Sequence, residues 1–135
     1  MSFEFILSQT DGRPMYLQII DQIKSRVTVG DWKRGYKLPS IRELAVATRV
    51  SVITVKRAYQ ELEREGVIVT QQGKGSFIAE IDDLSVQLKQ QEMDKYLSQA
   101  ISVARSLGLS INDIKEALNK LMQSKNTNPS EKNHD

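Results

Sequence analysis

The sequence predicts a mainly α-helical protein of the α+β class, and three observations lead to this fold class. Apolar residues recur at helical spacing in several separated stretches. Serine precedes three of these stretches, in the position that caps a helix. Two short runs of β-forming residues enclose a glycine-bearing loop. The order helix, helix, tight turn, helix, hairpin is that of a winged helix-turn-helix, and two further helices follow it.

The composition excludes several classes of site. The chain has 135 residues, of which 39% are hydrophobic, with no cysteine and one histidine. These counts leave no disulfide framework, thiolate zinc site or histidine-based triad, so we expect no metal, no cofactor and no enzyme activity. The acidic pair Asp82-Asp83 does not alter this, since adjacent side chains point apart. Neither a basic leader nor an apolar run of about 20 residues is present, which predicts a cytoplasmic protein without a membrane segment.

The N-terminal part is predicted to be an arm followed by a helix. Residues 1–13 form the extended arm, which ends in a turn at Asp11-Gly12. Pro14 suits the first turn of a helix over residues 14–29. The apolar stripe of this helix consists of Tyr16, Leu17, Ile19, Ile20, Ile23 and Val27. Residues 31–39 follow as a loop.

The next two helices are predicted to form the helix-turn-helix. Ser40 and Glu43 make a capping box at the start of a short helix over residues 41–48. After a tight connection, Ser51 caps a third helix over residues 52–65. The inward stripe of the third helix is Val55, Ala58, Tyr59 and Leu62.

A β-hairpin is predicted next, with strands at residues 67–70 and 76–79 and the loop 71–75 between them. A phosphate-binding Walker A loop needs Gly-Lys-Ser/Thr between a strand and a helix, whereas here a glycine and a second strand follow Lys74. We interpret the hairpin as a wing whose lysine approaches a phosphate backbone or a minor groove. The alternative is an ordinary tight turn.

Two helices are predicted after the wing, over residues 84–107 and 111–123. The second begins with a capping box at Ser110 and Asp113. The polar, aperiodic residues after them are expected to be disordered. The predicted division of the chain is a winged helix-turn-helix domain (1–80), a two-helix dimerisation or effector region (81–123) and a disordered tail (124–135).

Two helices alone cannot enclose a hydrophobic core, and neither a disulfide nor a metal is expected to stabilise them. A second copy of the chain would cover their apolar stripe and give a C2 homodimer. The residues expected at this interface are Leu88, Met93, Leu97, Ile101, Ala104, Ile114, Leu118 and Leu121. Two alternatives stay open: the helices fold back onto their own N-terminal domain, or they form a sensor for an unknown effector.

The distribution of charge indicates an anionic partner for the first part of the chain. Residues 1–79 hold 12 basic and 8 acidic side chains, net +4, whereas residues 80–135 are net −2. In a helix-turn-helix the second helix enters the major groove of DNA with its first residues toward the bases. The residues expected to contact double-stranded DNA are Arg42, Ser51, Val52, Ile53, Thr54, Lys56, Arg57 and Lys74. The alternatives are a solvated surface and a winged-helix module that binds protein, and the outward cations of the third helix favour DNA.

Three separated blocks keep a distinctive order and spacing: GYKLPSIRELA (35–45), VSVITVKRAYQELEREG (50–66) and GKGSFI (73–78). Together they resemble the DNA-binding half of GntR-family bacterial transcriptional regulators, over about residues 14–79. The short remainder resembles the YtrA subfamily, often encoded beside transporter operons. The resemblance implies a homodimer that binds a palindromic operator, usually as a repressor. The DNA contacts it implies map to Arg42, Ser51, Thr54, Lys56, Gly73 and Lys74.

Two positions depart from the family pattern. Many members carry arginine directly after the serine that caps the third helix, where this chain has Val52 followed by Ile53. Arginine commonly hydrogen-bonds guanine, whereas apolar groups contact the methyl group of thymine. Lys56 replaces a frequent arginine and lacks its bidentate fork. A guanine contact is therefore not carried over to position 52.

Overall fold

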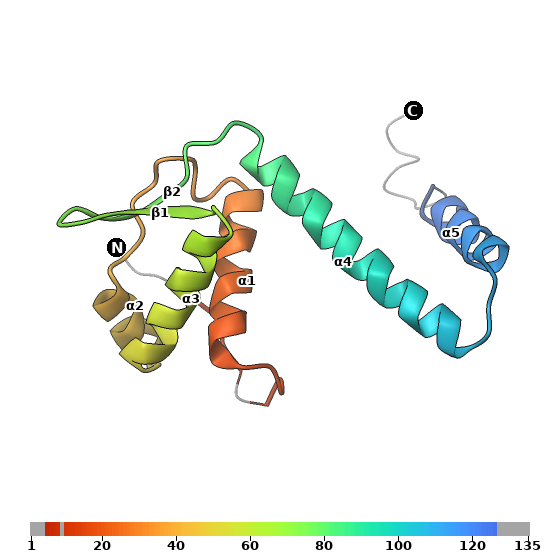
Figure 1. Ribbon diagram of the computed structural model, residues 1–135, viewed down its shortest axis with the longest axis horizontal. Helices are drawn as coiled ribbons and strands as arrows, with labels where there is room; N and C mark the ends of the chain where they lie inside the picture. The colour runs from red at the N-terminus through yellow and green to blue at the C-terminus, as the bar shows by residue number, and fades with distance from the viewer. Residues whose placement is uncertain (1–4, 9, 127–135) are drawn as a thin grey trace. The chain divides into compact units, whose positions relative to one another are not determined.

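The computed structural model describes residues 5–8 and 10–126 of the chain (Figure 1). Along the chain the elements are α1 (Met15–Thr28), α2 (Ile41–Thr48), α3 (Val52–Arg64), β1 (Ile68–Gln71), β2 (Gly75–Ile78), α4 (Leu84–Ser106) and α5 (Ile111–Asn126). They divide into two compact units, with the boundary inside α4 after Gln90. The predicted fold class is confirmed: the chain is mainly helical, and the described residues form one small antiparallel sheet.

α3 is the central helix of the first unit and contacts α1, α2 and β1. Figure 1 shows α1 and α3 side by side. The predicted inward stripe of α3 is buried. Its Tyr59 hydroxyl donates to the carbonyl oxygen of Pro39 at 2.6 Å, and burial raises the pKa of Tyr59. This hydrogen bond ties the segment that precedes α2 to the middle of α3.

α1 differs in one respect from its predicted stripe. Ile19, Ile20 and other members of the stripe are buried, but Leu17 is exposed. The buried neighbour is instead Gln18, which is the one buried polar side chain of the described residues. Apolar periodicity could not identify this residue, because its burial depends on hydrogen bonds with a distant segment.

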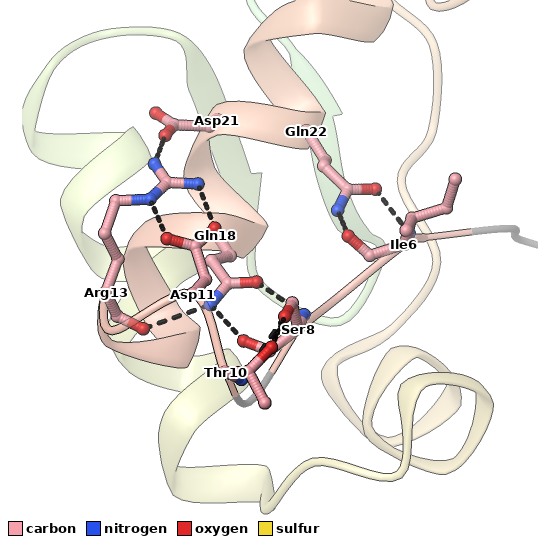
Figure 2. Close-up of polar contacts among 8 residues, drawn as sticks. All are labelled: Ile6, Ser8, Thr10, Asp11, Arg13, Gln18, Asp21 and Gln22. Atoms are coloured by element: carbon pink, nitrogen blue, oxygen red, sulfur yellow. Dashed lines mark hydrogen bonds and ion pairs between the residues drawn. The ribbon is translucent and has the colours of Figure 1, made fainter.

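Those hydrogen bonds hold the arm that precedes α1 (Figure 2). The side-chain oxygen of Gln18 accepts the N–H of Ser8 at 2.8 Å, and its amide nitrogen donates to the Ser8 carbonyl at 2.8 Å. Gln22, one helical turn later, engages the N–H and the carbonyl of Ile6 in the same way. Ile6 and Ser8 are two residues apart, so the two amides pair with the arm as a neighbouring β-strand would.

An aromatic cluster extends the core beyond the helices. Trp32, in the loop after α1, is buried and stacks on Tyr36 with 4.9 Å between ring centroids. Phe5 of the arm lies 6.1 Å from the Trp32 ring, and Leu7 packs against the same core. The guanidinium of Arg26 lies over the Phe5 and Trp32 rings at 4.8 and 5.4 Å. Residues 5–8 of the arm are therefore part of the folded unit.

We expect Gln18→Ala to lower the free energy of unfolding by about 2 kcal/mol, because part-buried backbone groups of Ser8 and Arg13 lose their partner. Urea denaturation followed by circular dichroism measures the change. Gln22→Ala is the matched control. Its partner Ile6 is 86% exposed, so water can replace the amide and a smaller loss is expected. Equal losses in the two variants would contradict the assignment of Gln18 as the principal anchor.

The β-hairpin forms where it was predicted and is joined by a third segment. β1 and β2 pair antiparallel, in the register that places Gln71 opposite Gly75. Lys37, before α2, forms a β-bridge with Phe77 of β2. The N–H of Leu38 donates to the carbonyl of Ser76 at 2.8 Å. These bonds connect the wing to the segment that leads into α2.

The first unit extends beyond the predicted domain boundary at residue 80. Leu84 and Leu88, in the first two turns of α4, are buried in its hydrophobic core. Leu88 was expected at a dimer interface, and the structure buries its side chain within one chain. α5 continues through residues 124–126, which were expected to be disordered. The rest of the expected tail, 127–135, lies outside the described residues.

The second unit contains the end of α4 and α5. Its capping box forms as predicted: Ser110 N–H donates to the Asp113 carboxylate at 2.8 Å, and this bond holds the pKa of Asp113 below its ordinary value. Ala104 is buried and Ile114 is half-buried. The other expected interface residues of this unit are exposed: Met93, Leu97, Ile101, Leu118 and Leu121. In the part of the chain that the structure describes, no helix has the length and apolar character needed to span a bilayer.

Candidate nucleic-acid interface

The turn between α2 and α3 determines how α3 is presented. Arg49 ends α2 with φ at 58°, a left-handed conformation that is uncommon for a residue with a Cβ. Val50 N–H donates back to the carbonyl of Ala45 at 3.1 Å. Ser51 then caps α3, and its hydroxyl accepts the N–H of Thr54 at 3.1 Å. The chain therefore turns within a few residues and leaves the first turn of α3 on the surface.

The start of α2 is held by the predicted capping box. Glu43 N–H donates to the Ser40 hydroxyl at 3.0 Å, and Ser40 N–H donates to the Glu43 carboxylate at 2.8 Å. The backbone hydrogen bond from Ser40 is the main reason that the pKa of Glu43 lies below its ordinary value. Arg42 lies between these two residues with its side chain exposed.

We expect Glu43 to contribute to the loss of stability in acid. A carboxyl whose pKa is lower in the folded state stabilises the fold above its unfolded value, here 4.5, and the contribution is lost as the pH falls through the folded value. Glu43→Gln should remove this dependence while keeping an acceptor for the Ser40 N–H. Urea denaturation at a series of pH values between about 7 and about 3 should show a shallower decline for the variant. Parallel profiles would count against this role.

The first turn of α3 presents two apolar and two hydroxyl side chains. Val52 is 47% exposed and Ile53 is 80% exposed. The hydroxyls of Ser51 and Thr54 lie 2.8 Å apart and hydrogen-bond each other. Both lie at the N-terminal end of α3, where the helix dipole favours an anion such as a phosphate.

Several cationic side chains of this surface form no ion pair with any residue that the structure describes. Among them are Arg42 on α2, Lys56 on α3 and Lys74 at the tip of the wing, and all three are exposed. Lys24 on α1, by contrast, pairs with Glu65 at 2.7 Å. An unpaired cation keeps its charge available for a phosphate, so the charge of this surface is suited to a nucleic-acid backbone.

Arg57 is held in a different way. Its guanidinium carbon lies 3.8 Å from the centroid of the Tyr16 ring, and its Nη2 donates to the Tyr16 hydroxyl at 3.2 Å. α1 therefore orients this predicted DNA-binding residue, which does not extend freely from α3. The side chain remains exposed, and the guanidinium keeps further donors for a phosphate.

The tip of the wing requires glycine at two positions. Gly73 has φ at 79° in the turn that the N–H of Lys74 closes on the carbonyl of Gln71 at 2.9 Å. Gly75 has φ at 124°, and a Cβ there would lie 3.0 Å from Cε of Lys37. Any other residue at position 75 would therefore be strained by this φ, and its Cβ would require a small shift of the Lys37 side chain, which lies beside the wing.

Two cations of this surface were missed by sequence reasoning, Lys37 and Arg49. The position of Lys37 depends on its bridge with Phe77, and that of Arg49 on a left-handed backbone. Neither the bridge nor the left-handed backbone can be predicted from a local sequence pattern. The available signal was the charge of residues 33–74, which hold 9 basic and 4 acidic side chains. No three His, Cys, Asp or Glu side chains among the described residues are arranged to hold a metal ion.

Comparisons with known proteins agree with this geometry. Residues 15–78 match the bacterial regulatory proteins of the gntR family. The transcriptional repressor YtrA of Bacillus subtilis is 40% identical over 104 residues, which cover 76% of this chain and 80% of YtrA. The chain belongs to the GntR family. It is therefore a DNA-binding transcriptional regulator and not an enzyme.

Solved structures of GntR regulators share this fold. A GntR family transcriptional regulator from Listeria monocytogenes is similar with a TM-score of 0.67 and 33% identity, over 82% of this chain and 96% of that one. The DNA-binding domain of AraR in complex with operator ORX1 is similar with a TM-score of 0.53 and 27% identity, over 58% of this chain and 99% of that one. A domain of this fold therefore binds operator DNA in at least one relative.

Proposed function

We propose that two chains form a homodimer that binds a palindromic operator and represses transcription there. The observation that carries the proposal is the exposed apolar surface of the second unit, next in sequence to a DNA-binding unit. Its members include Met93, which is 49% exposed, and Leu121, which is 60% exposed. Monomeric proteins rarely expose a large contiguous apolar surface to water. A two-fold symmetric pairing of this surface would bury it and produce two equivalent α3 helices.

In the proposed complex each α3 enters a major groove of the same duplex. The two half-sites are about one helical turn, roughly 34 Å, apart. Val52 and Ile53 face the base edges, Lys56 reaches either a base edge or a phosphate, and Arg42 binds the phosphate backbone. Each wing carries Lys74 to a flanking minor groove. This arrangement uses the apolar, hydroxyl and unpaired cationic side chains of α2, α3 and the wing together.

Four further points extend the proposal: repression, the regulated target, the location and an effector. The relative YtrA is a repressor by name, which supports repression by this chain. The resemblance to the YtrA subfamily favours a transporter operon as the regulated target, and a protein that acts on chromosomal DNA is expected in the cytoplasm. An effector that binds the second unit would act by changing the separation of the two α3 helices.

The function is tested by selecting bound duplexes from a random library with the full chain. Recovery of a palindrome with half-sites about 10 base pairs apart is the expected result. Sedimentation of the free protein and of the complex should give two chains in both. A chain that binds no duplex at low ionic strength would overturn the function and favour a module that binds protein.

The salt dependence of operator binding provides a second, quantitative test. If about four cations of each chain contact phosphates, the slope of log K against log salt concentration should be roughly −7 for the dimer. Fluorescence anisotropy over a salt series measures it. A slope near zero would contradict binding through the cationic surface of α2, α3 and the wing.

A further inference from the structure

The surface formed by α2 and the first turn of α3 exposes three apolar side chains, Val46, Val52 and Ile53, which we call the apolar patch. Val46, on α2, and Ile53, on α3, are each 80% exposed. Val52 lies between them in sequence and is 47% exposed. A shallow depression joins the two helices at this point and is lined by Arg42, Ala45, Val46, Val50, Ser51 and Val52. The patch therefore lies on the surface that the proposed function turns toward the major groove.

Side chains of valine and isoleucine have no hydrogen-bond donor or acceptor, so they cannot bind the polar edges of the bases. The apolar group that the major groove offers is the 5-methyl of thymine. We propose that Val52 and Ile53, with Val46 beside them, bind thymine methyl groups in each operator half-site. The inference rests on the proposed function and adds the base preference at the first turn of α3.

Two features of the surroundings support this choice of ligand. The unpaired cations Arg42 and Lys56 lie on either side of the patch in sequence, and their contacts with the duplex hold the first turn of α3 in the groove. β-branched side chains are stiff at χ1, so burial of the patch costs little side-chain entropy. The hydroxyl of Ser51 already caps α3 and bonds Thr54. The apolar side chains are thus the groups at this turn that have no other role.

The experiment removes single methyl groups from the DNA. In the operator recovered by selection, each thymine is replaced in turn by deoxyuridine, in both half-sites at once, and Kd is measured by fluorescence anisotropy at one salt concentration. At one or two thymine positions we expect weakening of about fourfold per half-site, hence about 16-fold for the duplex, from the burial of one methyl group. Replacement at other positions should leave Kd unchanged.

The same duplexes are then measured with Val52→Ala and Ile53→Ala. Each variant should bind the thymine operator more weakly. At the thymine that the substituted side chain contacts, the penalty for deoxyuridine should fall to less than about twofold, because the variant has already lost the contact with that methyl group. Val29→Ala is the matched control. This valine ends α1, is 65% exposed and lies outside the proposed interface, so the full methyl effect should remain.

Two results would overturn the inference while leaving the proposed function intact. One is an operator that binds tightly and tolerates deoxyuridine at every position. The other is a methyl effect that Val52→Ala and Ile53→Ala both retain in full, since other residues would then contact the thymines. A chain that binds no duplex would instead overturn the proposed function together with this inference.

Discussion

Leu97→Asp is expected to convert the proposed dimer into a monomer and to weaken operator binding by a factor of about 10² to 10⁴, the usual gain from joining two binding modules. Leu97 lies on α4 in the second unit, one helical turn from Met93 and from Ile101, and all three are exposed in the single chain. In the symmetric pairing an aspartate at this position would bring two carboxylates into an apolar contact. Such a burial is strongly unfavourable because the charges have no partner there.

Sedimentation equilibrium at micromolar concentration measures the change in mass, and anisotropy with the operator measures the change in affinity. Gln99→Asp is the matched control, since Gln99 is exposed and the variant adds the same charge two residues away, on the opposite side of α4. It should leave both the mass and the Kd unchanged. If Leu97→Asp remained a dimer, the second unit would not be the dimer contact and its apolar surface would need another partner.

Features whose cause is local were predicted well from the sequence. Ser40 with Glu43, and Ser51 with Thr54, cap the two helices of the helix-turn-helix as expected, because each cap needs only a hydroxyl and a backbone N–H three residues later. The hairpin strands begin and end within one residue of their predicted bounds. The order and type of the elements therefore followed from caps, glycines and periodicity.

Features that depend on contact between distant segments were not predicted. Gln18 is buried because it pairs with an arm ten residues earlier, and Trp32 because the same arm covers it. Leu88 continues the helical stripe of α4, yet it packs into the first unit, because a stripe does not reveal which of two surfaces will cover it. Burial in each case is a property of tertiary packing.

In the candidate site, too, features with a local cause were predicted and features that depend on distant contacts were not. Which residues lie on the outer face of α3 follows from helical periodicity, and Lys56 is exposed as expected. What each outward side chain contacts does not follow, because the partner can come from another helix. Arg57 lies one residue from Lys56 and was expected to act with it, but Tyr16 of α1 holds its guanidinium. Lys56 is therefore the cation of α3 that is most directly available to DNA.

Lys56→Ala is expected to weaken operator binding about 100-fold without changing the free energy of unfolding. A hydrogen bond from a charged donor contributes about 1.5 kcal/mol, and the dimer loses two of them. The fold should be unaffected, since the Lys56 side chain is exposed and makes no ion pair with any described residue. Anisotropy gives Kd, and urea denaturation gives the stability.

The salt series separates the two kinds of contact that Lys56 can make. If its ammonium binds a phosphate in each half-site, the slope of log K against log salt should become less negative by about 2. If it contacts a base edge, the affinity falls but the slope stays nearly the same, and one position of the operator loses its preference. Lys24→Ala removes the same charge from α1, where Lys24 pairs with Glu65, and should change neither quantity. An equal loss from Lys24→Ala and Lys56→Ala would mean that overall charge, rather than a contact of α3, controls the affinity.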